Sequence, residues 1–162
     1  MKFKIKFAET KKDFFNAKQL FKEYSDSLNF SLSFQNIDNE LDNIPGKYSK
    51  PNGCIILAWY NFTPIGCIGM RPLDELTCEI KRLYLKPNYR GLGLGRLLTK
   101  NIIAYSRKRE YLKACLDTTS KMKKAISIYK SLGFVEISAY YNNPLPDVIF
   151  FELNLQKKIN NN

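Results

Sequence analysis

Apolar and polar residues alternate, or apolar residues form short continuous runs, in seven segments of the chain. Alternation is typical of a β-strand with one buried face, and a continuous run is typical of a strand that is buried on both faces. Turn-forming residues separate most of these segments, as residues 61–64 do between the second and the third. The pattern predicts strands over residues 2–7, 54–60, 65–70, 77–85, 113–118, 134–140 and 148–155.

Four other segments repeat apolar residues at every third or fourth position, which places these residues on one face of an α-helix. Thr10 is suited to cap the first helix. The apolar residues from Phe34 to Ile44 predict a short second helix that ends at Pro45-Gly46, and Gly133 suits the C-terminal cap of the last helix. The predicted helices cover residues 11–28, 34–44, 94–105 and 121–132.

The length of 162 residues is enough for one domain with a real core, and we expect a single domain over residues 1–156 followed by a polar tail over 157–162. The hydrophobic content of 44% is that of a globular protein, and no apolar run approaches the roughly 20 residues of a membrane span. The N-terminal segment alternates lysine with apolar residues and lacks the apolar core of a signal peptide. These features predict a cytoplasmic protein.

The chain has no histidine and four cysteines, which excludes a Cys-His catalytic pair. The cysteines lie in apolar, strand-like segments without Cys-x-x-Cys spacing, so we interpret them as reduced core residues and expect no metal site. The formal net charge of +11 would attract a polyanion. The lysines are spread along the whole chain, however, and no nucleic-acid-binding module is recognisable, which argues against a nucleic-acid partner.

Three glycines alternate in the run Arg90-Gly91-Leu92-Gly93-Leu94-Gly95, between a predicted strand and a predicted helix. Without a β-carbon, the main chain can turn its N–H groups toward an anion, and the N-terminus of the following helix adds positive potential. A P-loop would have Lys-Ser/Thr after the last glycine, and a dinucleotide fingerprint would have its third glycine at Arg96. The run fits neither motif, and it matches the pattern Arg/Gln-x-x-Gly-x-Gly/Ala.

Together with the segments on either side, this run resembles the GNAT superfamily of acetyl-CoA-dependent N-acetyltransferases. Residues 78–87 are similar to the fourth strand of the family, and residues 125–134 to its fourth helix and the turn that follows. The order of the predicted elements is also that of the GNAT fold. The resemblance implies an α/β (α+β) fold with about four helices and a mixed, mostly antiparallel sheet of seven strands, splayed between the fourth and fifth strands.

The resemblance also implies where acetyl-CoA would bind. Its pantetheine arm would lie in the gap of the sheet, and residues from Arg90 to Arg96 would take the pyrophosphate. Main-chain N–H groups just past a bulge in the fourth strand would polarise the thioester carbonyl; they belong to Leu83, Tyr84 and Leu85. Many relatives carry an asparagine at the position of Met122, where it binds pantetheine, so we expect Thr118, Thr119 or Ser120 to supply that contact.

Two side chains match catalytic positions of the family. Glu79 lies 11 positions before Arg90, a spacing similar to that of the catalytic glutamate of histone-type members, and it would accept the proton of the amine. Alternatively, Glu79 forms a structural ion pair with Lys81 or Arg82, or it binds the substrate cation. Tyr129 matches the family tyrosine that protonates the CoA thiolate, although its position also suits packing against the sheet.

The resemblance places acceptor specificity in residues 24–35 and 140–147. Four aromatic residues there could form a pocket for a small amine or belong to the ordinary core: Phe30, Phe34, Tyr140 and Tyr141. No cysteine or serine is placed to carry an acyl group, so we favour direct transfer to a small-molecule primary amine in a ternary complex. The alternatives are an acyl-CoA sensor without activity, a protein N-terminal or lysine acetyltransferase, and an RNA-binding protein. Relatives commonly form homodimers.

Overall fold

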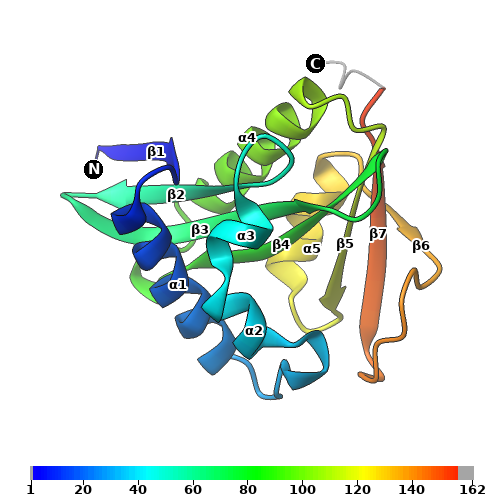
Figure 1. Ribbon diagram of the computed structural model, residues 1–162. Coiled ribbons are helices and arrows are strands. Elements are labelled where there is room, and N and C mark those ends of the chain that lie inside the picture. Colours follow the sequence, from blue (N-terminus) through cyan, green and yellow to red (C-terminus); the bar gives the residue numbers. More distant parts are fainter. Residues whose placement is uncertain (1, 157–162) are drawn as a thin grey trace.

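The computed structural model describes residues 2–156, which form one seven-stranded sheet with helices on both faces (Figure 1). The strands lie in the order β1-β2-β3-β4-β5-β7-β6, and only β4 and β5 are parallel neighbours. The predicted mixed, mostly antiparallel sheet is thus confirmed. The strands are β1 (Phe3–Phe7), β2 (Cys54–Tyr60), β3 (Thr63–Pro72), β4 (Thr77–Leu85), β5 (Lys113–Thr119), β6 (Val135–Ile137) and β7 (Val148–Asn154).

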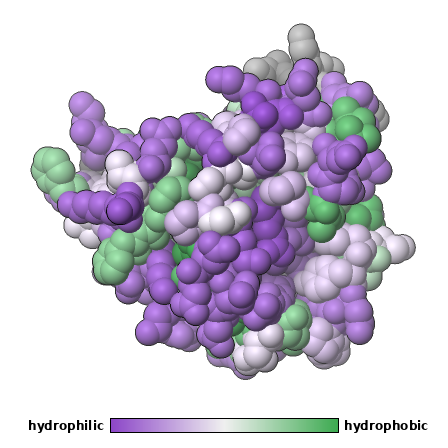
Figure 2. Space-filling view, viewed as in Figure 1, coloured by the Kyte–Doolittle hydropathy of each residue, from purple (hydrophilic) through white to green (hydrophobic). Residues whose placement is uncertain are grey.

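Five α-helices cover the sheet, and each face of the sheet has its own core because successive strand side chains point to opposite faces. In β2, Ile55 and Leu57 pack beneath the first helices, whereas Ile56 and Ala58 pack beneath α4. The outer surface over α1, α2 and α3 is mostly hydrophilic (Figure 2), as expected for amphipathic helices. The helices are α1 (Lys11–Asp26), α2 (Ile37–Asp42), α3 (Ile44–Tyr48), α4 (Leu94–Lys108) and α5 (Lys123–Ser131).

The single helix predicted over residues 34–44 is wrong. This segment contains a short 3-10 turn at Ser33–Gln35 and then α2 and α3, which accounts for the fifth helix. Asn36 separates the turn from α2 with a left-handed φ of 55°. The side chain of Asn43 caps α3, so Pro45 lies in a first helical turn, where its missing N–H leaves no hydrogen bond unmade. Pro45-Gly46 therefore begins a helix here instead of ending one.

The strand predicted over residues 134–140 is also shorter than expected. β6 ends at Ile137, and residues 138–147 form a loop that returns to β7. The side chains of Tyr140 and Tyr141 are hydrogen-bonded to Glu79 on β4 and Asp117 on β5, so the loop packs against the gap between these two strands. The polar tail predicted for residues 157–162 lies outside the described residues. No helix within residues 2–156 is long and apolar enough to cross a membrane.

The predicted separation of the fourth and fifth strands is present. β4 and β5 pair only at residues 77–79 and 113–115, and beyond these residues they diverge (Figure 1). Within β4 the pairing with β3 also shifts, because Tyr84 faces Cys67 while Lys81 faces Gly69. The extra residue is accommodated by Arg82, whose φ is 61°. The second half of β4 is therefore bulged, and within residues 2–156 no strand lies beside it on its β5 side.

Candidate active site

Two hollows open where β4 and β5 diverge. The larger is a groove of about 980 Å³ between the end of β4, the glycine run and the start of α5. The smaller is a cavity of about 60 Å³ between β4, β5 and the segments that follow α1 and β6. Both are lined by the same four residues where they meet: Tyr24, Leu83, Met122 and Ala125. The two hollows are thus adjacent, and these four residues stand between them.

The glycine run forms one end of the groove. Gly91 and Gly93 have φ values of 77° and 78°, which a residue with a β-carbon rarely adopts. A β-carbon added at either position would touch no atom within 4 Å, so backbone conformation, not space, calls for glycine. Gly93 is the N-cap of α4, and no side chain within residues 2–156 caps this helix. The N–H groups of its first turn are therefore available to an anion in the groove.

The other residues between Gly91 and Gly95 differ in how they are packed. A β-carbon on Gly95 would lie 3.2 Å from Cδ1 of Ile128, so this glycine allows α4 and α5 to approach closely. The side chain of Leu94 is buried in the core, whereas that of Leu92 is exposed. Any contact of Leu94 with a ligand must come from its main chain.

Five cationic side chains line the groove: Arg90, Arg96, Lys121, Lys123 and Lys124. Nε of Arg90 donates to the carbonyl oxygen of Leu85 at 2.9 Å, and Nη1 of Arg96 donates to Oγ of Ser131 on α5. These bonds join the cations to the end of β4 and to α5. A long groove with uncapped helix N–H groups and clustered cations fits the polyanionic end of CoA.

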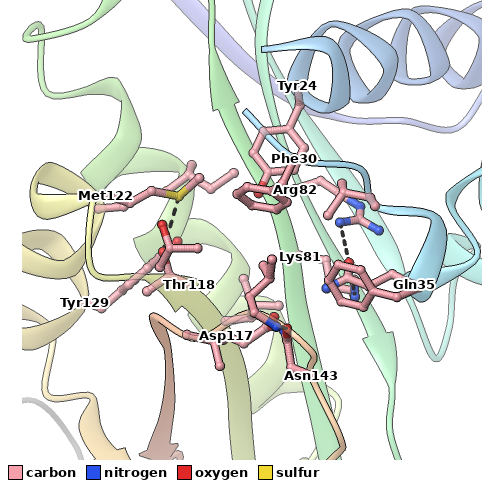
Figure 3. Close-up of a pocket in the computed structure, with 18 residues that line it drawn as sticks. Tyr24, Phe30, Gln35, Lys81, Arg82, Asp117, Thr118, Met122, Tyr129 and Asn143 are labelled. Carbon is pink, nitrogen blue, oxygen red and sulfur yellow. Dashed lines mark hydrogen bonds between the residues drawn. The ribbon is translucent and has the colours of Figure 1, made fainter. Parts of the chain in front are cut away.

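Thr118 lies in the small cavity and is not among the described residues that line the groove (Figure 3). Its hydroxyl is hydrogen-bonded to Sδ of Met122 at 3.3 Å, and Met122 lines both hollows. Met122, which stands where many relatives have asparagine, is therefore at the junction, and Thr118 lies on the cavity side of it.

Tyr129 extends from α5 into the small cavity (Figure 3). Its ring packs against Phe134 and Phe151, with centroids 5.7 and 6.3 Å away, so the packing interpretation holds for the ring. Its hydroxyl has no hydrogen-bond partner among residues 2–156. Burial raises the pKa of Tyr129, which keeps the phenol protonated and able to donate a hydrogen bond.

Glu79 is 3% exposed and is not among the described residues that line either hollow. Its Oε1 faces Nε and Nη2 of Arg71, both at 3.1 Å, and Nζ of Lys81 at 3.6 Å. Its Oε2 accepts a hydrogen bond of 2.7 Å from the hydroxyl of Tyr140. The geometry favours a structural ion pair with Lys81 over direct access to an amine, and the role of Glu79 as base stays a prediction.

Comparison with known proteins bears on what this site does. The model of the Acetyltransferase (GNAT) family matches residues 16–134, which is most of the chain. The chain belongs to the GNAT family. It is 42% identical to an uncharacterised N-acetyltransferase of Schizosaccharomyces pombe, over 86% of this chain and 87% of that protein. It is 31% identical to an uncharacterised N-acetyltransferase of Dictyostelium discoideum, over 94% and 99% of the two chains.

Solved structures agree on the fold. An acetyltransferase from Streptococcus agalactiae superposes with a TM-score of 0.77 at 23% identity, over 94% of this chain and 98% of that one. An acetyltransferase of Salmonella typhimurium, solved with its cofactor acetyl-CoA, superposes with a TM-score of 0.72 at 17% identity, over 100% and 99%. This chain is thus an N-acetyltransferase of the GNAT family.

The small cavity of this GNAT acetyltransferase is lined by Asp117, which the sequence patterns did not single out, and by Lys81, which they named only as a possible partner of Glu79. Asp117 lines it from β5, and Lys81 lines it from β4 (Figure 3). Burial lowers the pKa of Lys81, although Glu79 counteracts the effect. A signal for Asp117 was present in the sequence, because it is the only acidic residue in the otherwise apolar and hydroxyl-bearing strand after Lys113.

The aromatic residues predicted to surround the acceptor are divided by the structure. Phe30 and Phe34 line the small cavity. Tyr140 and Tyr141 instead pack on Phe150, with ring centroids 5.2 and 5.5 Å away, and direct their hydroxyls to Glu79 and Asp117. The tyrosines therefore orient the carboxylates of the site.

A buried ion pair supports the bulge of β4. Nε and Nη2 of Arg82 donate to the two oxygens of Glu40 on α2, at 3.0 and 2.7 Å, and the hydroxyl of Tyr48 donates to Oε1 at 2.7 Å. Burial by itself would raise the pKa of Glu40, but its bonds with Arg82 outweigh burial and hold that pKa below its ordinary value. Arg82 is thereby held in place, with its left-handed backbone, at the wall of the cavity.

Proposed function

We propose that this acetyltransferase transfers the acetyl group of acetyl-CoA directly to the primary amine of a small molecule. The observation that carries this proposal is the junction of the groove and the small cavity at Leu83, beside the unpaired edge of β4. Acetyl-CoA in the groove would present its thioester at this junction, where an amine in the cavity can reach it. Direct transfer is supported because the two substrates would meet without an intermediate carrier.

The residues of the groove would divide the work of holding acetyl-CoA. The N–H groups of residues 91–95 and the surrounding cations would bind the phosphates. The main-chain N–H groups of residues 83–85 would donate to the thioester carbonyl, because the bulge at Arg82 and the absent neighbouring strand leave that edge of β4 open. The three lysines and two arginines that line the groove make it positively charged, which supports phosphate binding there.

As the amine nitrogen attacks the carbonyl carbon, the amine loses a proton to solvent water or to a base of the protein. The carbon–sulfur bond then breaks, and the sulfur leaves with the electron pair. The hydroxyl of Tyr129 would donate a hydrogen bond to that sulfur, because the phenol is protonated and otherwise unpartnered. Glu79 could serve as the base only if it gave up its contacts with Arg71, Lys81 or Tyr140.

A small acceptor is supported by the segments around the cavity. Nε2 of Gln35 donates to the hydroxyl of Tyr141 at 3.0 Å, which ties the segment after α1 to the loop before β7. A cavity of about 60 Å³ behind such a tie has room for the amine end of a slim acceptor. A protein acceptor would need to pass its terminus or a lysine side chain between the two segments.

The test is a calorimetric titration with acetyl-CoA, followed by a thiol-release assay with small amines, amino acids, polyamines and peptides. Binding together with turnover on small amines is the expected result. Turnover on peptides alone would replace the small acceptor with a protein, and binding without any turnover would favour a sensor. Absence of acetyl-CoA binding would overturn the proposal.

A further inference from the structure

Asp117 has an unusual position in the small cavity. It is the only acidic residue among the described residues that line the cavity, which is otherwise walled by aromatic, aliphatic, amide, hydroxyl and cationic side chains. It lies on β5 next to Thr118, across the gap from Lys81 of β4 (Figure 3). Asp117 therefore belongs to the wall of the cavity in which the acceptor amine is proposed to bind.

The surrounding residues fix one oxygen of Asp117 and leave the other without a partner. Oδ2 accepts from the hydroxyl of Tyr141 and from Nδ2 of Asn143, the latter at 3.0 Å. Tyr141 is itself an acceptor from the amides of Gln35 and Asn143, at 3.0 and 2.9 Å, so its own proton is directed to Asp117. No group within residues 2–156 donates to Oδ1.

The charge of Asp117 also differs from that of the other carboxylates nearby. Glu40 is paired with Arg82, and Glu79 is paired with Arg71 and Lys81, each within 4 Å. Within the described part of the chain, no lysine or arginine approaches Asp117 as closely. Lys81 shares the cavity wall, but its Nζ is turned to Glu79 and to Oε1 of Gln35, at 3.6 and 3.3 Å. A carboxylate held in this way has one oxygen and one negative charge available to a cation.

We propose that Oδ1 of Asp117 binds the ammonium group of the acceptor. The acceptor is then a primary amine that enters as a cation, and Asp117 is the residue that selects it over a neutral alcohol of the same shape. Tyr24 and Tyr129 line the same cavity, and a tyrosine hydroxyl can accept a hydrogen bond from the other N–H donors of the ammonium. This inference rests on the proposed function for its location, and it concerns the acceptor alone.

Ethylammonium chloride is a suitable probe, because it is small enough for the cavity and requires no turnover. The protein, with and without saturating CoA, is titrated with it while the amide of Thr118 and the side-chain amide of Asn143 are followed by NMR. Ethanol and sodium chloride at matched concentrations are the controls for shape and ionic strength. The wild type should show saturable shifts with ethylammonium and none with ethanol.

Asp117→Asn keeps the shape of the side chain and removes its charge, and it should weaken ethylammonium binding by about tenfold or more, as for the loss of a charge-assisted hydrogen bond. Glu136→Gln, which removes an exposed carboxylate on β6, is the control for net charge and should bind as the wild type does. Calorimetry with acetyl-CoA shows that each variant is folded.

Equal ethylammonium affinity in the wild type and in Asp117→Asn would overturn this inference. The lack of a saturable shift in the wild type would also overturn it. This second test needs no variant, so it still applies if Asp117→Asn does not fold. Either result could occur in a protein that binds acetyl-CoA and releases thiol, in which case the proposed function would stand. If the wild type does not bind acetyl-CoA, the proposed function is overturned instead. The ethylammonium titration without CoA would still test the role of Asp117.

Discussion

The groove and the small cavity share a junction but are built in different ways. The groove takes its shape from the main chain, through two glycines with positive φ, the uncapped start of α4 and the open edge of β4. The cavity takes its character from side chains of distant segments, which include Gln35, Lys81, Asp117 and Asn143. A binding site made from main-chain groups can be recognised from a local motif, whereas one made from side chains of several elements depends on the whole fold.

The two regions also differ in how their charges are compensated. The cations of the groove lie around an open hollow, where a polyanionic ligand can supply the missing negative charge. Two carboxylates beside the cavity, Glu40 and Glu79, are already paired with arginine or lysine, whereas Asp117 has no such pair among residues 2–156. The four predictions below separate the groove from the cavity, in order of decreasing expected effect.

The largest effect should come from the main chain of the groove. In Gly93→Val we expect the affinity for acetyl-CoA to fall by at least about a hundredfold, because hydrogen bonds to phosphate, worth about 1.5–3 kcal/mol each, would be lost from a distorted loop. Calorimetric titration measures the affinity, and an unchanged far-UV circular dichroism spectrum shows that the fold persists. Gly133→Ala is the control, since Gly133 also has a positive φ, of 96°, but lies outside both hollows. Unchanged affinity in Gly93→Val would remove the phosphate role of the loop.

The stability of the protein should depend on the buried ion pair between Glu40 and Arg82 at the wall of the cavity. In Glu40→Gln we expect the free energy of unfolding at pH 7 to fall by about 3 kcal/mol, because Arg82 would keep a buried charge without its partner. Urea unfolding between pH 3 and pH 7 measures this difference.

The pH dependence of that difference follows from the pKa of Glu40, which is lower in the folded protein than its ordinary value of 4.5. The stabilisation by the ionised carboxylate is complete above the unfolded pKa, and it is lost as the pH falls through the folded pKa. The stabilities of the wild type and of Glu40→Gln should therefore converge as the solution is acidified below about pH 4. A difference that stays constant down to pH 3 would show that the charge of Glu40 does not contribute.

A substitution at the junction should lower turnover and leave the affinity for acetyl-CoA nearly unchanged. In Tyr129→Phe we expect kcat to fall by about tenfold or more, because the leaving sulfur would lose its hydrogen-bond donor. The affinity for acetyl-CoA should change by less than about twofold, since the ring and its packing remain. Thiol release measures kcat, and calorimetry measures the affinity. Tyr89→Phe is the control, because Tyr89 is not among the described residues that line either hollow. Equal kcat in Tyr129→Phe and the wild type would leave Tyr129 with a packing role only.

The smallest change in turnover is expected at Glu79. In Glu79→Gln we expect kcat to change by no more than about threefold at temperatures well below unfolding, because Glu79 does not line the cavity and its oxygens are already paired. The variant should be less stable, since Arg71 and Lys81 would lose their shared partner. A general base contributes about 10²–10⁴ to the rate, so a loss of a hundredfold or more would establish Glu79 as the base.

Sequence patterns predicted best those elements whose signals are local. The seven strands, the cap at Thr10 and the glycine run each depend on a few neighbouring residues, and all have the expected place in the chain. The separation of β4 and β5 followed from resemblance to the GNAT superfamily, since no local pattern states which strands diverge.

The predictions that failed concern segments whose conformation depends on distant contacts. The spacing of apolar residues in 34–44 fits one helix, but Asn36 and Asn43 divide the segment, and Glu40 on α2 reaches Arg82 on β4. The strand after Phe134 stops early, and Tyr140 and Tyr141 then bind carboxylates on two other strands. Periodicity alone does not reveal such contacts.

The sequence by itself determined the family, the order of the strands and the loop that would hold phosphate, because these depend on main-chain propensities and on short motifs. Only the tertiary structure decided which carboxylate lines the small cavity. Glu79 and Asp117 are both acidic residues in strands, but packing surrounds Glu79 with two cations and leaves one oxygen of Asp117 free in the cavity. Charge compensation is a property of neighbours in space, and the order of residues along the chain does not contain it.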